Sequence, residues 1–413
     1  MRTAVVLGGG AAGFFGAIRA AESAPGARVL LLEATATPLQ KVRISGGGRC
    51  NVTNHASDPA VLVEKYPRGA KELRGVLSRF GPRETMAWFE ARGVALKVEA
   101  DGRVFPTTDD SETICAALLR EAQKAGVDVR TKASVQKAAR AEDGRLALDL
   151  KGGERLDADA LLIATGSNPQ GLRLAADLGH RVVPGVPSLF TFEVDDPRLA
   201  GLAGVSVPRV KAKALVGGET FEQEGPLLVT HWGLSAHAVL RLSAWGARAF
   251  HDAGYRAALV VDFAPGERDD ALRFRAEALR RERPAATLGA HPLVDDVPRR
   301  LWERLVQAAG GEPDARWAEV PNRGIQKLVD EIKRARFEVK GKGPFREEFV
   351  TAGGVDRRDV DWRTMESRVC PGAFFAGEVL DVDALTGGFN LQNAWSTGWI
   401  AGGAMGARLS STG

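Results

Sequence analysis

Cysteine is scarce in this chain. Its 413 residues include three cysteines, Cys50, Cys115 and Cys370, which lie far apart and form no CxxC pair. A disulfide framework and a cysteine zinc site are therefore excluded, and a reducing compartment is expected. We predict no metal site.

Long apolar runs and an excess of one charge are also missing. No apolar run approaches the roughly 18 residues that span a bilayer, and Met1 leads directly into a predicted strand without a signal segment. We therefore expect a cytoplasmic protein without a membrane segment. Because 56 basic residues oppose 52 acidic ones, the net charge is only +4. The dense basic stripe of a nucleic-acid-binding protein is absent, so nucleic acid is not an expected partner.

The N-terminal part of the sequence has a complete strand–helix–strand pattern. An apolar strand leads into a G-G-G-A-A-G turn, and an alanine-rich helix and a second apolar strand follow. In such a turn Gly8 permits the tight bend, Gly10 admits a diphosphate and Gly13 lets the helix pack on the sheet. Glu33 stands where an acid binds the adenosine ribose. We predict dinucleotide binding rather than a plain glycine-rich turn, and the motif alone leaves FAD and NAD open.

Residues 41–54 form a polar, glycine-rich insertion directly after the second strand. Gly46–Gly48 expose backbone amides, and Lys41, Arg43 and Arg49 add positive charge. A minimal NAD-binding fold has no use for such a segment, whereas it could surround a flavin and its ribityl chain. The insertion therefore favours FAD over a flexible surface loop.

The C-terminal part predicts a second helix that faces the ligand. A short strand is followed by a Gly-Glu turn, a glycine-rich segment and a helix over 393–404. A helix N-terminus favours negative charge, and we expect the amides of Gly388, Asn390 and Leu391 at the O2/N1 edge of the flavin. No second G-x-G-x-x-G motif follows a strand, so a separate NAD(P)H-binding domain is not predicted.

The middle of the chain predicts an inserted domain of short strands and helices. We assign an FAD-binding domain to residues 1–186 and 343–413 and the inserted domain to 187–342. Helices are predicted over 72–92, 111–124, 270–283, 299–309 and 325–337.

Several motifs together resemble one known family. They are I-S-G-G-G-R-C-N-V-T-N at 44–54, G-R-V-F-P at 102–106, T-H-W-G-L-S at 230–235, and the segments 350–355, 364–367, 375–383 and 386–392. The chain resembles the BaiN/RdsA family of NAD(P)/FAD-dependent oxidoreductases, which includes YhiN-like and aminoacetone-oxidase-like flavoproteins. The resemblance implies an α/β fold: a glutathione-reductase-like FAD-binding Rossmann domain interrupted by an inserted β-barrel plus helical domain.

The resemblance also implies a set of cofactor-binding residues. They are Gly8, Gly10, Ala12, Gly13, Glu33, Ala34, Lys41, Ser45, Gly46, Asn51, Val135, Ala164, Thr165, Gly166, Gly377, Glu378, Asp381, Gly388, Asn390 and Leu391. The chain departs from the family pattern at Ala236-His237, where Gly-Pro is usual, and at Ser167, where a second glycine is usual. A relative's substrate should therefore not be transferred directly.

Three residues are candidates for the chemistry itself. His231 could exchange a proton at the open face of the flavin, or it could satisfy a backbone carbonyl. Arg49 could anchor an anionic substrate or the diphosphate. Cys50 could be a redox cysteine, with packing of a small residue as the alternative. Glu378 and Asp381 are expected to bind the ribityl chain or a phosphate-bound water rather than to act as acids.

These features predict an FAD-dependent oxidoreductase that exchanges hydride at flavin N5 with a small or medium organic molecule. NADH or NADPH is the candidate reductant. The alternatives are an FAD-dependent amine oxidase that uses oxygen, a flavoprotein of tRNA modification, and a noncatalytic FAD-binding protein. The sequence leaves the oligomeric state open.

Overall fold

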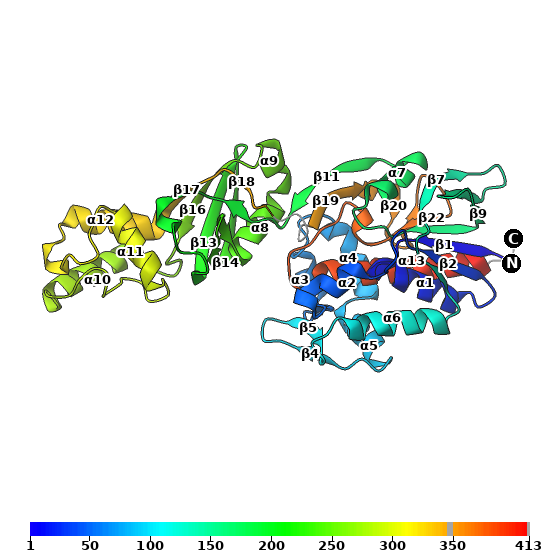
Figure 1. The fold of residues 1–413 in the computed structure, drawn as a ribbon, viewed down its shortest axis with the longest axis horizontal. Coiled ribbons are helices and arrows are strands. Elements are labelled where there is room, and N and C mark those ends of the chain that lie inside the picture. The colour runs from blue at the N-terminus through cyan, green and yellow to red at the C-terminus, as the bar shows by residue number, and fades with distance from the viewer. Residues whose placement is uncertain (345–349, 411–413) are drawn as a thin grey trace. The chain divides into compact units, whose positions relative to one another are not determined.

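The computed structural model describes residues 1–344 and 350–410. The chain divides into two compact units, one made of Met1–Gly185 and Thr351–Gly413 and the other of Val186–Val350 (Figure 1). Each unit has its own hydrophobic core. The chain therefore leaves unit 1, forms unit 2 and returns to unit 1.

The centre of unit 1 is a seven-stranded sheet in the order β20-β21-β22-β10-β1-β2-β6. Its strands are β1 (Thr3–Leu7), β2 (Arg28–Leu32), β6 (Asp128–Arg130), β10 (Ala160–Ile163), β20 (Val360–Asp361), β21 (Glu366–Ser367) and β22 (Ala373–Phe375). The run from β22 to β6 is parallel. β1, β2 and β10 are buried along almost their whole length, as strands covered on both faces are.

The register of this sheet brings several loops to one edge. Leu7 pairs with both Ile163 and Leu32, and Ile163 also pairs with Phe375. Because these strands are parallel, the turns that follow β1, β2, β10 and β22 lie together at the carboxyl edge, where parallel sheets bind ligands.

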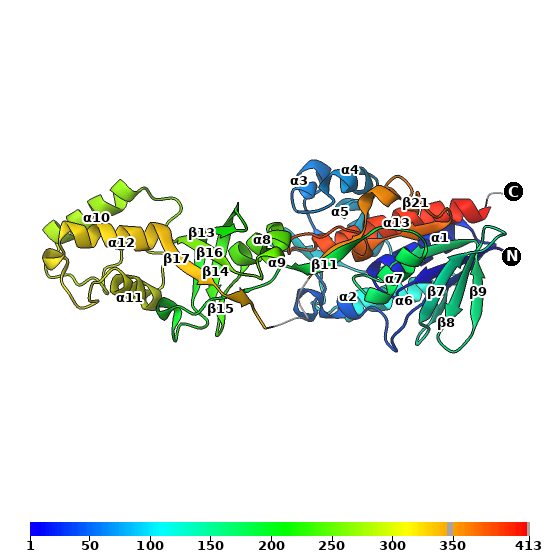
Figure 2. The same cartoon turned by 90° about the horizontal axis from the view of Figure 1, so that it is seen from above.

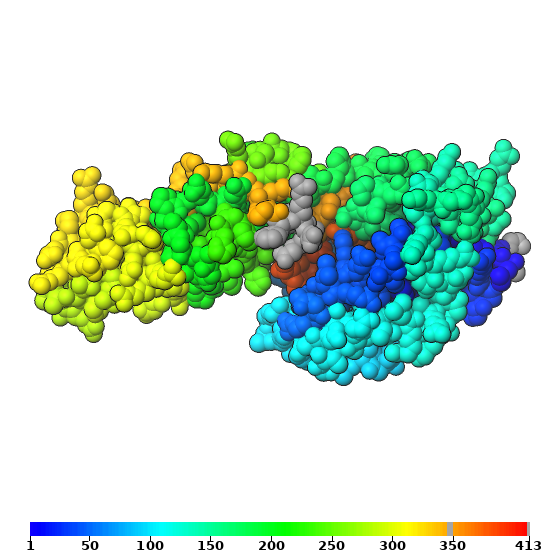
Figure 3. Space-filling model, in the orientation of Figure 1, coloured from blue at the N-terminus to red at the C-terminus, as the bar shows by residue number. Residues whose placement is uncertain are grey.

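Helices and smaller sheets surround the central sheet. The helices are α1 (Ala11–Ser23), α2 (Gln40–Ile44), α3 (Pro59–Val63), α4 (Ala70–Arg79), α5 (Pro82–Glu90), α6 (Glu112–Lys124), α7 (Pro169–Asp177) and α13 (Phe389–Ser410). The smaller strands are β3 (Thr53–Asn54), β4 (Leu96–Val98), β5 (Arg103–Pro106), β7 (Val135–Arg140), β8 (Leu146–Leu150), β9 (Arg155–Ala158), β11 (Val182–Ser188) and β19 (Val350–Val355). The β7–β8–β9 sheet lies at the surface of unit 1 (Figure 3).

Glycines let α13 lie directly against α1 (Figure 2). Gly398, Gly402 and Gly406 recur at intervals of four residues along α13. A Cβ on Gly402 would lie 2.4 Å from the Gly16 carbonyl oxygen of α1. The two helix backbones are therefore in contact, and this contact fixes the C-terminal helix beside the first helix.

The single helix predicted over 72–92 is wrong, since α4 ends at Arg79 and α5 begins at Pro82. Proline suits the first position of a helix, where its missing N–H is not needed. The Glu84 carboxylate accepts a hydrogen bond from the Gly81 amide at 3.0 Å, which caps the new helix. The apolar spacing continues across the break, so periodicity alone did not reveal it.

Unit 2 holds a second seven-stranded sheet, in the order β17-β16-β13-β14-β15-β12-β18. Its strands are β12 (Phe192–Glu193), β13 (Ser206–Val216), β14 (Glu219–Val229), β15 (Gly233–Ser235), β16 (Ala257–Asp262), β17 (Ala335–Val339) and β18 (Gly341–Lys342). Lys340 alone separates β17 from β18, so one chain segment supplies both edge strands. Closure of this sheet into a barrel stays a prediction.

The helices of unit 2 are α8 (His237–Trp245), α9 (Ala247–Asp252), α10 (Asp269–Glu282), α11 (Arg299–Ala308) and α12 (Asn322–Arg334). The prediction of a helix as far as residue 337 is wrong, because β17 begins at Ala335. Ala335, Phe337 and Val339 are buried and alternate with exposed residues, which is the period of a strand. Within the described ranges, no helix combines the length and the apolar character needed to cross a bilayer.

Candidate cofactor site

The glycine turn between β1 and α1 lies at the carboxyl edge of the central sheet. Gly8 has a φ of 102°, and a Cβ on it would lie 2.5 Å from the Ala164 carbonyl oxygen after β10. A Cβ on Gly13 would lie 1.9 Å from the Gly8 carbonyl oxygen. A Cβ on Gly10 would meet no atom within 4 Å. Packing within the protein therefore requires Gly8 and Gly13, whereas Gly10 borders open space at the N-terminus of α1.

Glu33 follows β2, and its carboxylate lies beside the glycine turn. Oε2 accepts a hydrogen bond from the Gly9 amide at 2.8 Å, and Oε1 accepts from the amide and hydroxyl of Thr35, each at 2.7 Å. Ala34 is exposed in the same turn. The ribose contact of Glu33 and the cofactor contact of Ala34 stay predictions, and both residues border the turn that would hold the diphosphate.

Lys41, Gly166 and Glu378 come together from three distant parts of the chain. The Lys41 ammonium forms an ion pair with Glu378 Oε2. A Cβ on Gly166 would lie 3.5 Å from that oxygen and 3.8 Å from Lys41 Nζ. Glu378 Oε1 also accepts from the Thr351 amide at 3.3 Å. The ion pair thus joins α2 to the turn after β22, and the turn after β10 lies beside it.

The glycine-rich insertion has a left-handed backbone. The glycines of the 3₁₀ turn Ser45–Gly48 have φ values of 59°, 70° and 85°, which residues with a Cβ rarely adopt. The Ser45 hydroxyl donates to the Val42 carbonyl at 2.8 Å. A Cβ on Gly46 would lie 2.8 Å from the Asn51 amide nitrogen. Glycine is therefore needed for this shape, whatever the segment binds.

The Asn51 side chain connects this insertion to the C-terminal segment. With its amide oriented to satisfy both neighbours, Asn51 accepts from the Gly388 amide and donates to the Thr53 carbonyl, each at 2.9 Å. The Gly388 amide is thus engaged inside the protein. Its predicted donation to the flavin stays a prediction.

The C-terminal helix begins at Phe389, so the prediction of a start at residue 393 is wrong. The Asn390 side chain accepts from the Ala384 amide at 2.9 Å and donates to the Ala384 carbonyl at 3.0 Å, which closes the preceding loop. Asn390 and Leu391 therefore lie in the first turn of α13. Amides at the start of a helix have no acceptor within the helix, so the predicted flavin contacts of Asn390 and Leu391 stay predictions that this position favours.

The other predicted cofactor residues lie in several environments. Ala12 is buried in α1, and a Cβ on Gly377 would lie 3.0 Å from its Cβ. Val135 begins β7 in the small β7–β8–β9 sheet. Asp381 is buried, and its carboxylate lies 3.4 Å from the Arg357 guanidinium. The turn residues Ala164 and Thr165 follow β10 at the carboxyl edge.

Thr165 Oγ1, in the turn after β10, and Asn393 Oδ1, near the start of α13, are among the buried polar atoms of unit 1 that have no hydrogen-bond partner within the described part of the chain. Buried polar groups are normally paired, so such atoms indicate a missing ligand or water. Together with the open space beside Gly10, they show that the residues present fit a bound dinucleotide. Asn393 escaped the sequence analysis because a lone asparagine within a predicted helix carries no signal.

The Arg49 side chain interacts with neighbouring residues of unit 1. Its guanidinium forms ion pairs with Glu99 at 2.7 Å and Asp109 at 3.4 Å and lies 3.9 Å from the centre of the Phe105 ring. These hydrogen bonds, Glu99 first, raise the pKa of Arg49. Such surroundings favour a structural role, and the predicted contact with substrate or diphosphate stays a prediction.

Cys50 is fully buried. Burial raises the pKa of its thiol to about 12, with a smaller contribution from nearby Cys115 of α6 and against the lowering effect of a hydrogen bond with Ser45. The thiolate is the reactive form, so this environment favours the packing interpretation. The sequence showed no cysteine near Cys50, because the structure brings the two together only through the packing of α6 on the insertion, where the Ser111 amide donates to the Gly48 carbonyl at 2.9 Å.

His231 lies in unit 2 and is exposed. It stands in the turn between β14 and β15, which is closed by a hydrogen bond of 2.8 Å from the Thr230 amide to the Gly233 carbonyl. Its role in proton exchange stays a prediction.

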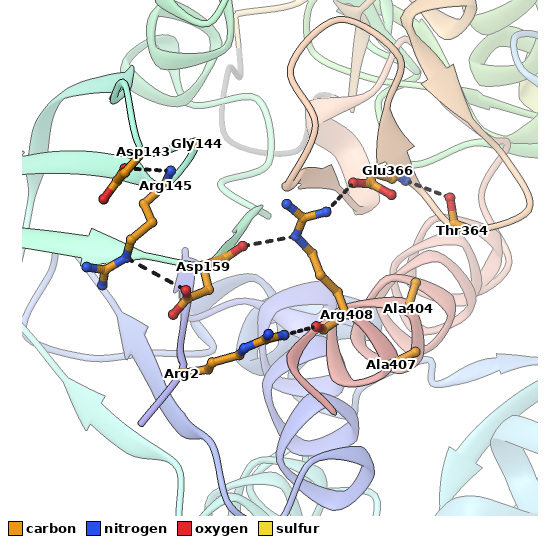
Figure 4. A pocket seen from close by; sticks show the side chains of 10 residues that line it. All are labelled: Arg2, Asp143, Gly144, Arg145, Asp159, Thr364, Glu366, Ala404, Ala407 and Arg408. Carbon is orange, nitrogen blue, oxygen red and sulfur yellow. Dashed lines mark hydrogen bonds and ion pairs between the residues drawn. The ribbon is translucent and has the colours of Figure 1, made fainter. Parts of the chain in front are cut away.

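A cavity of ≈ 630 Å³ lies in unit 1 at the amino ends of β1 and β10, away from the glycine turn (Figure 4). Its charged residues are Arg2, Asp143, Arg145, Asp159, Glu366 and Arg408. Arg408 lies 3.4 Å from Glu366, and Arg145 lies 3.7 Å from Asp159. Arg2 donates to the Arg408 carbonyl at 2.7 Å. Because these charges neutralise one another, we interpret the cluster as structural. It links the start of the chain, the turn between β7 and β8, and the end of α13.

The fold and the site define a Rossmann-type FAD-binding protein of the flavoenzyme kind, with a parallel sheet, a glycine turn before α1 and a returning C-terminal helix. Residues 2–404 match the family described as HI0933-like protein Rossmann domain, and the chain belongs to this family. It is an FAD-dependent oxidoreductase, and the resemblance noted in the sequence is confirmed.

Proteins similar to this chain include two with named activities. The chain is 33% identical to the ribosomal RNA dihydrouridine synthase of Escherichia coli (strain K12), over 96% of each chain. It is 31% identical to the 3-dehydro-bile acid delta(4,6)-reductase of Clostridium scindens, over 96% of this chain and 97% of the relative. Neither alignment leaves out a large part of either protein.

Solved structures share the fold. The 3-ketosteroid-delta4-(5alpha)-dehydrogenase of Rhodococcus jostii RHA1 superposes with a TM-score of 0.52 at 16% identity, covering 98% of this chain and 97% of that one. The 3-ketosteroid delta1-dehydrogenase of Sterolibacterium denitrificans gives 0.52 at 14% identity, covering 98% and 100%.

Proposed function

We propose that this chain reduces a carbon–carbon double bond conjugated to a carbonyl group, with FAD as its resident cofactor and NADH or NADPH as the reductant. The proposal rests on the names of two relatives. Both names describe the reduction of a carbon–carbon double bond that is conjugated to a carbonyl group. A dihydrouridine synthase saturates the C5–C6 bond of uracil, next to the C4 carbonyl. A delta(4,6)-reductase of a 3-dehydro bile acid saturates bonds conjugated to the 3-oxo group.

The substrate that we favour is uridine in ribosomal RNA. Two relatives, 33% and 29% identical to this chain, carry that activity in their names. The steroid-acting relative is 31% identical, which makes a 3-oxo steroid the second candidate. This substrate departs from the expectation, drawn from the nearly balanced charge of the chain, that nucleic acid is not a partner.

The residues of unit 1 account for the binding side of this reaction. Bound FAD would supply hydride from N5. The N-terminus of α1 would hold the diphosphate beside Gly10, and Glu33 would bind the ribose. The ion pair of Lys41 and Glu378 would border the cofactor where the turns after β10 and β22 meet. His231 is the candidate that delivers the proton to the second carbon of the reduced bond.

The test uses the purified full-length protein under anaerobic conditions. NADH or NADPH is added while the flavin absorption is recorded, and unmodified ribosomal RNA or a 3-oxo-4,6-diene steroid follows. We expect one nicotinamide to bleach the flavin and the RNA to restore its oxidised spectrum. Mass spectrometry of the nucleosides should then show uridine that has gained two hydrogens. The matched control is an acceptor whose bond is already saturated.

Each outcome separates the alternatives. Reoxidation by the steroid and not by the RNA selects the second candidate. A flavin that is bleached but reoxidised by neither acceptor contradicts the proposal. Oxygen consumption with an amine, in the absence of nicotinamide, supports the amine oxidase instead.

A further inference from the structure

Gln392 is fully buried in the first turn of α13 and makes three hydrogen bonds with its side chain. Oε1 accepts from the Thr53 hydroxyl at 2.5 Å, and Nε2 donates to the hydroxyls of Thr85 at 3.0 Å and Ser396 at 2.8 Å. All four residues have 0% exposure. Because water does not reach them, each of these polar groups depends on its partner.

The direction of these hydrogen bonds is fixed. The Ser396 hydroxyl donates to the Phe80 carbonyl at 2.6 Å, so it can only accept from Gln392. The amide group of Gln392 must therefore turn Nε2 toward Ser396 and Oε1 toward Thr53. Thr53 is left as the donor that satisfies this oxygen.

The same contact joins two segments that are far apart in sequence. The Trp395 indole donates to the Val52 carbonyl at 2.9 Å, and the Asn54 amide group donates to the Gly387 carbonyl at 3.3 Å. A Cβ on Gly388 would lie 2.5 Å from the backbone of Thr53. The end of the insertion and the start of α13 are therefore joined by hydrogen bonds, and their backbones are in contact.

We propose that Gln392 is a positioning residue for the cofactor. The two segments that it joins are the insertion at 41–54 and the first turn of α13, and both are predicted to hold the flavin. An apolar side chain could fill the same space, but it would not specify how far the two segments slide along each other. The hydrogen bonds of Gln392 to Thr53 and Ser396 specify that register, and with it the position of the free amides of the first turn.

A matched pair of variants at Thr53 tests this proposal. Thr53→Val keeps the shape of the side chain and leaves Gln392 Oε1 without a donor, whereas Thr53→Ser keeps the donor. Gln392→Leu removes all three hydrogen bonds. Gly402→Ala is the control, because it disturbs α13 against α1 and leaves the Gln392 contacts intact. Two quantities are measured. The first is the dissociation constant for FAD, obtained from a titration monitored by flavin fluorescence, and the second is the reduction potential of the bound FAD.

We expect Thr53→Val to raise the dissociation constant about tenfold, which corresponds to one lost buried hydrogen bond, and Gln392→Leu, which removes three, to raise it at least as much. Both should shift the reduction potential, and Thr53→Ser should restore both values. The control should lower the free energy of unfolding without moving the potential. If Gln392→Leu does not fold, the Thr53 pair decides. The proposal would be overturned if Thr53→Val had the same FAD affinity and reduction potential as the parent protein. It would also be overturned if Gly402→Ala shifted the reduction potential as much as Thr53→Val does. No substrate is needed, so the result is independent of the proposed reaction.

Discussion

Gly10 and Gly13 belong to one turn, but their surroundings differ. We expect Gly10→Ala to leave the free energy of unfolding of the apoprotein unchanged and to weaken FAD binding, because its methyl group would enter open space that the diphosphate needs. Gly13→Ala should destabilise the apoprotein itself by about 1–3 kcal/mol, because its Cβ would collide with the Gly8 carbonyl. Urea unfolding and FAD titration measure the two effects separately. Unchanged FAD affinity in Gly10→Ala would mean that the diphosphate lies elsewhere.

His180 is a buried imidazole whose protonation state follows from its partners. Nδ1 lies 2.9 Å from the Ala175 carbonyl oxygen, which can only accept, so Nδ1 carries the proton. Nε2 lies 2.6 Å from the Ser367 hydroxyl and accepts from it. The Ser367 oxygen in turn accepts from the amides of Val369 and Cys370. Burial lowers the pKa of His180 below 6.5, so the folded protein holds the neutral form.

This neutral histidine predicts a loss of stability in mild acid. Below pH about 6.5 the unfolded chain binds a proton that the folded protein does not, so the free energy of unfolding falls as the pH drops through this range. The contribution is fully present above that pH. His180→Gln should lessen the difference in urea midpoint between pH about 7.5 and about 5.5. Asp356 and Asp361 have pKa values of about 2 in the folded protein, and these carboxyl groups affect stability mainly at lower pH. Equal differences in the parent and the variant would contradict the prediction.

At the scale of elements, the contact of α13 with α1 depends on glycine, since a Cβ on Gly402 would lie 2.4 Å from the Gly16 carbonyl oxygen. We expect Gly402→Leu to lower the free energy of unfolding by about 1–3 kcal/mol or more, because a side chain there would push the helices apart. Its neighbour Gly403 is the matched control, since a Cβ on it would meet only Arg19 Nε at 3.7 Å. Gly403→Ala should be neutral or stabilising by up to about 1 kcal/mol through helix propensity. Thermal unfolding of both variants measures the difference, and similar losses would show that the helices are not in close contact.

Local patterns were sufficient to predict the elements that depend on local chemistry. The G-G-G-A-A-G turn with its flanking strand and helix was predictable because each glycine has a separate geometric task within a few residues. The ends of helices were harder to predict from the sequence. The break at Gly81-Pro82 and the change to a strand at Ala335 both lie within continuous apolar spacing, and the start of α13 at Phe389 depends on the distant contacts of Asn51 and Gln392.

The candidate site was predictable to the extent that it follows from motifs. Lys41, Gly166 and Glu378 were named separately from the sequence, and the structure brings them together. The ion partners of Arg49 and the hydrogen bonds of Gln392 join residues that lie far apart in the chain. Contacts of this kind depend on the packing of whole elements, so no spacing rule could reveal them.

At the scale of the whole molecule, the two units have separate hydrophobic cores. All the predicted cofactor residues lie in unit 1, and His231 lies in unit 2. The two points where the chain crosses between the units are neighbours, because a Cβ on Gly185 would lie 2.9 Å from Thr351 Cγ2. A short linker could therefore replace unit 2 without stretching unit 1.

We expect a protein in which a few glycine and serine residues replace 186–350 to fold and to bind FAD, since the central sheet, α1 and α13 all remain. It should show the flavin absorption of the full chain and cooperative urea unfolding, because its core is complete. Reduction of the conjugated double bond should be lost together with unit 2. A shortened protein that folds but does not bind FAD would show that unit 2 contributes to the cofactor site. One that binds FAD and still reduces the substrate would remove His231 from the reaction.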